Sequence, residues 1–269
     1  MNTVFIAIIS MTAIGLICSI LLAVASKVMH VEVDERMALI RNCLPGANCG
    51  ACGYSGCNGY ATAIVEDDVA ANLCPPGGNE VVTQISEIMG LGAGAGVTRS
   101  VAVVHCIGNN ETKSDKMEYM GMTTCVAAKL HFGGQNACSF GCMGFGDCVK
   151  ACPSDAVCIE KGLARVDMRK CTGCGLCAGA CPSKVISITP APVYTSVMCK
   201  NNEKGGVLKD KCKVGCIGCM KCVKECPSEA LTLKDNLAVN DFSKCTGCLA
   251  CVEVCPKSCI VSFSEVSTM

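Results

Sequence analysis

The sequence predicts an α+β protein that combines one membrane-spanning helix, a small four-cysteine domain and two similar cysteine-rich modules in tandem. Three observations lead to this prediction. The chain has 269 residues and 28 of them are cysteine, several times the usual share. Residues 1–26 carry no charged side chain. A four-cysteine spacing that ends in Cys-Pro recurs within residues 101–269.

Composition narrows the class of protein. Aromatic residues make up 4% and tryptophan is absent, so the apolar core is thin and bound metal is expected to help hold the fold. Basic and acidic side chains balance at 23 each, which gives no support to nucleic-acid binding. Disulfides suit small secreted domains, whereas this chain is long. The high cysteine content therefore points to zinc sites or iron–sulfur clusters, which the cysteine spacing can distinguish.

The first segment, residues 1–26, predicts a single-pass anchor in the bacterial inner membrane. A helix from Thr3 to Ser26 spans roughly 36 Å, enough for a hydrocarbon core of ~30 Å. Lys27, Arg36 and Arg41 follow it and no basic residue precedes it, which places the rest of the chain in the cytoplasm. A cleaved signal peptide is the alternative, but the basic region that begins one is missing.

The next segments predict a helix over 27–43, a compact cysteine and glycine block over 44–76, and a flexible linker. The linker covers 77–100, with a short helix at Val81–Met89 before the glycine-rich stretch Gly90–Gly96.

Three later runs share one spacing. They are Cys171-x2-Cys174-x2-Cys177-x3-Cys181-Pro, Cys216-x2-Cys219-x2-Cys222-x3-Cys226-Pro and Cys245-x2-Cys248-x2-Cys251-x3-Cys255-Pro. This is the bacterial ferredoxin run, in which three thiolates bind one [4Fe–4S] cluster and the fourth binds its neighbour. Zinc sites usually pair two separated C-x2-C knuckles instead, so zinc is a remote alternative.

An altered run precedes these three. Residues 138–153 align without a gap with 212–227, and Phe145 stands where the later run has Cys219. We infer that Cys138, four residues before Cys142, substitutes for the missing ligand. Residues 101–195 and 196–269 are then two ferredoxin-like modules, each with short strands such as Leu163–Asp167 and Leu237–Asn240.

The pairing rule of such runs assigns four ligand sets. They are Cys138, Cys142, Cys148 and Cys181 (set 2); Cys152, Cys171, Cys174 and Cys177 (set 3); Cys216, Cys219, Cys222 and Cys255 (set 4); and Cys226, Cys245, Cys248 and Cys251 (set 5). The 27–76 domain adds set 1, which is Cys49, Cys52, Cys57 and Cys74. The spacing of set 1 suits zinc or a cluster, and its glycine-rich loop favours a fifth [4Fe–4S] cluster.

Eight cysteines remain: Cys18, Cys43, Cys106, Cys125, Cys158, Cys199, Cys212 and Cys259. Cys158 and Cys259 are expected to be buried structural thiols. Cys106 and Cys199 occupy matching places before the two modules. With Cys125 and Cys212 they form the hypothesis of a sixth cluster, and four unrelated buried thiols are its alternative. No residue pattern indicates a catalytic side chain.

Three stretches carry a resemblance to a known family. Leu44-Pro-Gly-Ala-Asn-Cys-Gly-Ala-Cys-Gly-Tyr-Ser-Gly-Cys57, Gly141-Cys-Met-Gly-Phe-Gly-Asp-Cys148 and Cys171-Thr-Gly-Cys-Gly-Leu-Cys177 resemble the B subunits of the Rnf complex. The resemblance covers nearly the whole chain. It implies a subunit of a membrane ferredoxin:NAD⁺ oxidoreductase that pumps Na⁺ or H⁺, with other complex subunits, the lipid bilayer and soluble reduced ferredoxin as partners.

The expected function is therefore an electron relay from reduced ferredoxin into that complex. Residues 101–269 carry a surplus of basic side chains, and Lys209, Lys211 and Lys213 are candidates for steering an acidic ferredoxin. A solvated lysine face is the alternative for these three. The rival functions are a subunit of another membrane redox complex and a redox- or iron-sensing membrane protein without turnover.

Overall fold

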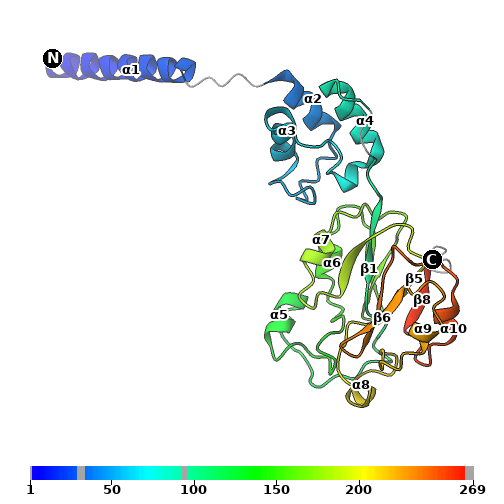
Figure 1. The fold of residues 1–269 in the computed structure, drawn as a ribbon. Coiled ribbons are helices and arrows are strands. Elements are labelled where there is room, and N and C mark those ends of the chain that lie inside the picture. The colour runs from blue at the N-terminus through cyan, green and yellow to red at the C-terminus, as the bar shows by residue number, and fades with distance from the viewer. Residues whose placement is uncertain (1, 29–33, 93–95, 264–269) are drawn as a thin grey trace.

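The computed structural model describes residues 2–28, 34–92 and 96–263 (Figure 1). The first element, α1, runs from Asn2 to Val28, and its apolar side chains, such as Met11 and Leu22, are strongly exposed. Within the described residues, no helix meets the length and hydropathy required of a membrane span. The helix predicted over 27–43 includes residues 29–33, which lie outside the described part.

A small helical domain follows. It consists of α2 (Glu35–Cys43), α3 (Cys57–Glu66), the 3₁₀ turn η1 (Pro75–Gly77) and α4 (Gly78–Met89). Asp34 caps α2, because its carboxylate accepts the backbone N–H of Arg36 at 2.8 Å. Ile40, Tyr60 and Ile85 are fully buried together in the core.

The end of this domain differs from the predicted boundary at residue 76. The sequence predicts that α4 belongs to the linker, but Val81 and Ile85 on its apolar face pack into the domain core beside α2 and α3. The helix ends at Gly90, whose φ of 65° is a left-handed conformation that suits glycine. The connection to the next domain therefore starts after Gly90, and its residues 93–95 lie outside the described part.

Two modules with the same strand pairing make up the rest. The first contains β1 (Ser100–Val104), α5 (Cys125–Leu130), α6 (Asp147–Lys150), β2 (Val157–Glu160), β3 (Leu163–Val166), α7 (Leu176–Gly179) and β4 (Ile186–Pro190). The second contains β5 (Thr195–Val197), α8 (Gly205–Lys211), α9 (Lys221–Lys224), β6 (Leu231–Lys234), β7 (Leu237–Asn240), α10 (Ala250–Glu253) and β8 (Ile260–Ser262). Each module pairs its first strand with its last and its two middle strands with each other, all antiparallel.

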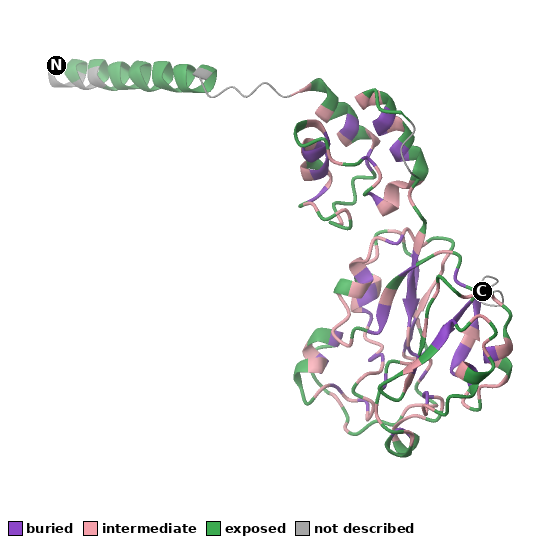
Figure 2. Cartoon of the chain, in the orientation of Figure 1, coloured by how far each residue is buried: buried purple, intermediate pink, exposed green. Residues whose placement is uncertain are grey.

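This arrangement fits the predicted duplication of a ferredoxin-like unit. The two short strands that the sequence predicts, Leu163–Asp167 and Leu237–Asn240, correspond to β3 and β7. The predicted boundary at 195/196 falls inside β5, so the second module starts slightly earlier. Within the two modules, Figure 2 shows many of the buried residues on the short strands, and buried cysteines such as Cys148 and Cys222 belong to the same cores.

The two modules also pack against each other. Val101 and Val103 of β1 share a core with Met198 and Phe263 of the second module. A second contact joins the loop before α5 to the end of α8, where the backbone N–H of Lys213 donates to the carbonyl of Thr112 at 2.9 Å. Main-chain pairing therefore brings loops of both modules to one place.

Candidate iron–sulfur sites

Set 1 lies in the helical domain, as the sequence predicted. Cys57 begins α3 and Cys74 immediately precedes η1. Burial raises the pKa of the Cys74 thiol, and the negative charges of Cys52, Cys49 and Cys57 raise it further. The hydroxyl of Tyr60 accepts the backbone N–H of Leu73 at 3.1 Å, which fixes the loop that carries Cys74. The four predicted ligands are thus near one another.

The first module contains a cavity of about 340 Å³ that the cysteines of set 2 were expected to line. Three of them do: Cys142, Cys148 and Cys181. The fourth cysteine at this cavity is Cys125, from the start of α5. Burial raises the pKa of Cys148 to about 12, and the neighbouring Cys142, Cys125 and Cys181 contribute in the same direction. The structure therefore places Cys125 where the sequence interpretation placed Cys138.

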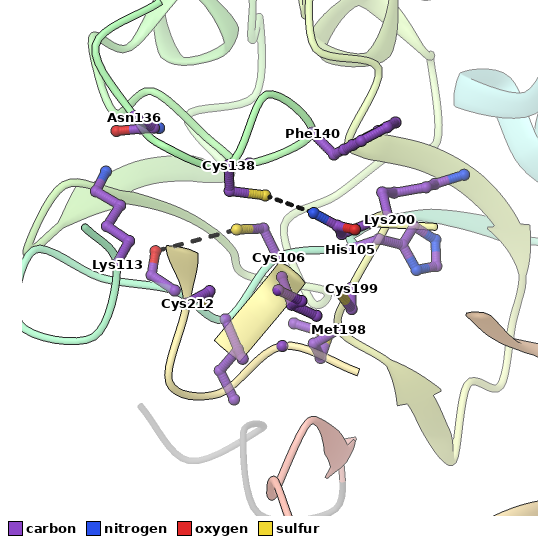
Figure 3. A pocket seen from close by; sticks show the side chains of 16 residues that line it. His105, Cys106, Lys113, Asn136, Cys138, Phe140, Met198, Cys199, Lys200 and Cys212 are labelled. Carbon is purple, nitrogen blue, oxygen red and sulfur yellow. Dashed lines mark hydrogen bonds between the residues drawn. The ribbon is translucent and has the colours of Figure 1, made fainter. Parts of the chain in front are cut away.

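Cys138 lies elsewhere, beside Cys106, Cys199 and Cys212 at a different cavity (Figure 3). The sequence does contain a signal for this arrangement. Cys138 aligns with Cys212, and Cys106 occupies the place that matches Cys199, so the four form two pairs related by the internal repeat. Cys125 has no counterpart in the second module, and its role could not be read from the repeat.

Set 4 lines a cavity of about 360 Å³ in the second module. All four expected ligands, Cys216, Cys219, Cys222 and Cys255, are there. The sulfurs of Cys255 and Cys259 are 3.6 Å apart, and their hydrogen bond lowers the pKa of the Cys255 thiol.

Sets 3 and 5 occupy equivalent places in the two modules. Burial raises the pKa of Cys177 to about 11, with further contributions from Cys171, Cys174 and Cys152. Burial also raises the pKa of Cys251, which lies close to its set members Cys245, Cys248 and Cys226; a hydrogen bond with Thr195 acts in the opposite direction.

Backbone amides point at the ligand sulfurs of these two sets. The N–H of Ala156 donates to the sulfur of Cys152 and that of Ala230 donates to Cys226, each at 3.3 Å. The N–H of Ala102 donates to Cys171 at the same distance. Such donors stabilise thiolates and set the potential of a cluster that they hold. The donor set and its surroundings therefore suit [4Fe–4S] clusters.

Glycine is required in the turns that bear the ligands. Gly144 and Gly218, each two residues after the first cysteine of a run, have φ of 80° and 67°. A Cβ on Gly144 would lie 2.5 Å from the carbonyl oxygen of Gly162, and one on Gly218 would lie 2.6 Å from that of Asn236. The cysteine turn of each module can thus pack directly on the turn of its middle hairpin.

The two cysteines expected to be structural differ from each other. Cys259 is buried, as expected. Cys158 is exposed on β2, so the prediction of burial is wrong for it. The strand alternates in burial, and the side chain at 158 points to the solvent face. Among the described residues, no group of three or more His, Cys, Asp or Glu side chains is arranged to hold a single metal ion.

Fold and cysteine arrangement together define an iron–sulfur protein of the bacterial ferredoxin type with several cluster sites. Comparison with protein families agrees. A family described as a putative Fe-S cluster matches residues 44–76, a 4Fe-4S dicluster domain matches 207–256, and 4Fe-4S binding domains match 164–187 and 138–156.

Curated relatives identify the family. The chain is 41% identical to the B subunit of the Na(+)-translocating ferredoxin:NAD(+) oxidoreductase complex of Acetobacterium woodii, over 97% of this chain and 78% of the relative. It is 43% identical to the B subunit of the proton-translocating ferredoxin:NAD(+) oxidoreductase complex of Clostridium ljungdahlii, over 90% and 86% of the two chains. A relative from Methanosarcina acetivorans, the B subunit of an ion-translocating oxidoreductase complex, is 38% identical over 87% and 89%.

The chain belongs to the family of B subunits of ion-translocating ferredoxin:NAD⁺ oxidoreductase complexes, the Rnf family. Its 4Fe-4S domains give it an electron-transfer role. The resemblance drawn from the sequence is confirmed.

Proposed function

We propose that this chain takes electrons from soluble reduced ferredoxin and passes them, one at a time, through [4Fe–4S] clusters into a Na⁺- or H⁺-translocating membrane complex. Sets 1, 3, 4 and 5 supply four of the clusters as predicted. The fifth, at set 2, is held by Cys125, Cys142, Cys148 and Cys181, with Cys125 in place of Cys138. When bound, each cluster accepts and returns a single electron.

The observation that carries this proposal is the closeness of the ligand sets within each module. Cys148 of set 2 and Cys177 of set 3 are packed in one buried core of the first module. Cys222 of set 4 and Cys251 of set 5 share the core of the second module in the same way. Paired clusters at such sites form a path for electrons, which a lone metal site does not.

The protein's own groups adjust how readily each cluster takes an electron. The N–H donors to Cys152, Cys171 and Cys226 favour the more negative, reduced state. Burial of Cys142, Cys148 and Cys222 opposes added charge. Hydrogen-bond donors and burial therefore both help to set the potential at which each cluster takes an electron.

Ferredoxin docking is proposed for the basic surface near α8. Lys209 and Lys213 are exposed there. Lys211 forms an ion pair with Glu203 and is only partly exposed, so it contributes less free positive charge than the sequence suggested. Cys219, a ligand of set 4, is exposed in the same module. An electron donor can thus approach this set closely.

Membrane attachment is proposed for residues 1–26, with the clusters on the cytoplasmic side. In support, these residues carry no charge, α1 is 27 residues long, and large apolar side chains such as Phe5 and Leu22 are more than half exposed to solvent. Lipid or partner helices would cover that surface. Fractionation of the full chain and of a variant lacking residues 2–26 tests this, because only the full chain should stay with membranes after a high-salt wash.

The decisive experiment for the relay mixes the anaerobically purified chain with reduced ferredoxin and follows bleaching of the cluster absorption. A relay should be reduced rapidly and should then pass electrons to partner subunits in membranes that lack this chain. A sensor without turnover would be reduced but would not restore electron flow to NAD⁺. A subunit of another redox complex would accept electrons from a different donor and slowly, if at all, from ferredoxin.

A further inference from the structure

We propose that Cys106, Cys138, Cys199 and Cys212 hold a sixth [4Fe–4S] cluster at the junction of the two modules, where it connects their cluster pairs. This inference rests on the iron–sulfur content of the proposed function but not on ferredoxin as the donor. It replaces Cys125 of the sequence hypothesis by Cys138. None of the matched family domains covers Cys106 or Cys199.

The space at this junction suits a cluster. The four cysteines line one cavity, as the four ligands of set 4 and those now assigned to set 2 line theirs. Figure 3 shows the four side chains around one space, carried by segments of both modules. Gly108 borders this space, since a Cβ built on it would lie 3.4 Å from the sulfur of Cys212 and 4.0 Å from that of Cys106.

Polar donors at this junction point at sulfur, as they do in the other sets. The side-chain amide of Asn201, which is 1% exposed, donates to the sulfur of Cys138 at 3.3 Å. The backbone N–H of Cys142 donates to the sulfur of Cys106 at 3.4 Å. A buried amide held toward a sulfur is the arrangement expected for a negatively charged thiolate ligand.

Positive charge is available as well. Lys113 and Lys200 line the same cavity. The ammonium of Lys113 is held by the carbonyl oxygens of Cys142 and Gly162, each at 3.3 Å. A cluster with four thiolates is an anion, and cations beside it offset the cost of burying it.

The proposed sixth site lies between the ligand sets of the two modules, where a cluster could carry electrons from one module to the other. Cys106 is linked to set 2, because it accepts the N–H of the ligand Cys142. Cys199 is linked to set 4, because it packs against the core of the second module that contains the ligand Cys216. The sixth site thus touches one ligand residue of each module. A [4Fe–4S] cluster held by these four cysteines would offer a one-electron site between the ligands of set 2 and those of set 4.

The test compares single alanine variants of the full chain, purified anaerobically. The variants fall into three groups: C106A, C138A, C199A and C212A at the proposed site; C125A and C148A at set 2; and C158A, an exposed cysteine outside every set, as control. Iron, sulfide and zinc per chain are measured, together with the EPR spectrum after reduction. Six clusters correspond to about 24 iron atoms in the wild type and five to about 20.

We expect each variant of the first group to lose about one sixth of the iron and the same EPR component. C125A and C148A should lose a different component, shared by these two, and C158A should lose nothing. The assignment of Cys125 to set 2 and of Cys138 to the sixth site is overturned if C138A loses the same EPR component as C148A while C125A loses the same component as C106A. The site itself is overturned by a wild type with about 20 iron atoms, or by zinc in place of iron at these cysteines.

If some variants fail to fold, the proposal can still be tested, because the iron content of the wild type gives the number of clusters by itself. Serine variants at the same positions, which keep the volume of the side chain, provide a second series. Failure of ferredoxin to reduce the wild-type chain would contradict the proposed function and leave this inference intact, because iron and EPR do not depend on the donor.

Discussion

Moving a ligand from α5 back to the cysteine turn tests the reasoning about set 2 most directly. The perturbation is the pair of substitutions Cys125→Ala and Phe145→Cys. Phe145 aligns with Cys219 of set 4, and the two turns have the same backbone. Gly144 and Gly218 both have positive φ, and the residues that follow 145 and 219, Gly146 and Met220, are both left-handed. A cysteine at 145 should therefore direct its thiol as Cys219 does.

The magnitudes follow from the surroundings. Cys125 is buried among Ala128 and Met143, with Phe145 packed against the same group. Removing its thiol alone should cost one cluster, or about four iron atoms per chain. Phe145 is half buried and packs against Tyr119 in a tilted arrangement, with ring centroids 5.7 Å apart and an interplanar angle of 58°. Replacing it by cysteine should cost about 1–3 kcal/mol of stability, less than the loss of a fully buried phenylalanine.

The assay measures iron and sulfide per chain, the EPR spectrum after reduction, and the midpoint of denaturant unfolding. Four proteins are compared: the wild type, C125A, F145C and the double variant. We expect C125A to lose the set 2 cluster and the double variant to regain it. The reasoning is refuted if C125A keeps a full complement of iron with an unchanged spectrum. It is also refuted if F145C folds with full iron but the double variant stays as deficient as C125A.

Three further predictions address the turns, the docking surface and the module junction. Gly218→Ala should lower stability by about 2–4 kcal/mol, since alanine is strained at positive φ and its Cβ meets a carbonyl of the β6–β7 turn; Gly206→Ala, where nothing lies within 4 Å, should be neutral or stabilising in the same unfolding experiment. Charge reversal at Lys209 and Lys213 should slow the reduction of the chain by ferredoxin several-fold at low salt, and at high salt the variant and the wild type should be reduced at the same rate. If the variant is reduced as fast as the wild type at low salt too, these lysines are only a solvated face. His105→Leu should cost about 1–3 kcal/mol, because its ring bonds to carbonyl and hydroxyl oxygens of both modules at 2.9 and 2.6 Å; a lowered unfolding midpoint with unchanged iron would confirm a structural role.

Much of this molecule could be predicted because cysteine spacing reports local geometry. Three thiolates within seven residues must come from one tight turn, and the proline after the fourth redirects the chain. These are short-range constraints that sequence contains in full. The ferredoxin-like modules and the family followed from them, and the structure brings together the cysteines predicted for sets 3, 4 and 5. The extent of the helical domain did not, because the packing of α4 on α2 and α3 depends on tertiary contacts rather than on the glycine-rich stretch after it.

The places of Cys125 and Cys138 could not be predicted from cysteine spacing alone. Cys138 is nearer in sequence to the altered turn than Cys125, and proximity along the chain favoured it. In the folded protein the choice is made by pairing between modules. Lys113 forms an isolated β-bridge with Cys212, and the ring of His105 bonds to the carbonyl of Val197 in the other module. Such contacts exist only once both modules have formed.

The internal repeat explains why four cysteines meet at the junction of the two modules. Duplication gives some cysteines an equivalent in the other module, and an interface between the copies brings such equivalent residues together from both sides. Cys106 and Cys138 meet Cys199 and Cys212 in this way. Two thiols per module cannot hold a cubane, whereas the packed pair supplies four. A cluster at this junction would form only when the modules dock, so its binding energy would hold together the same two units between which it carries electrons.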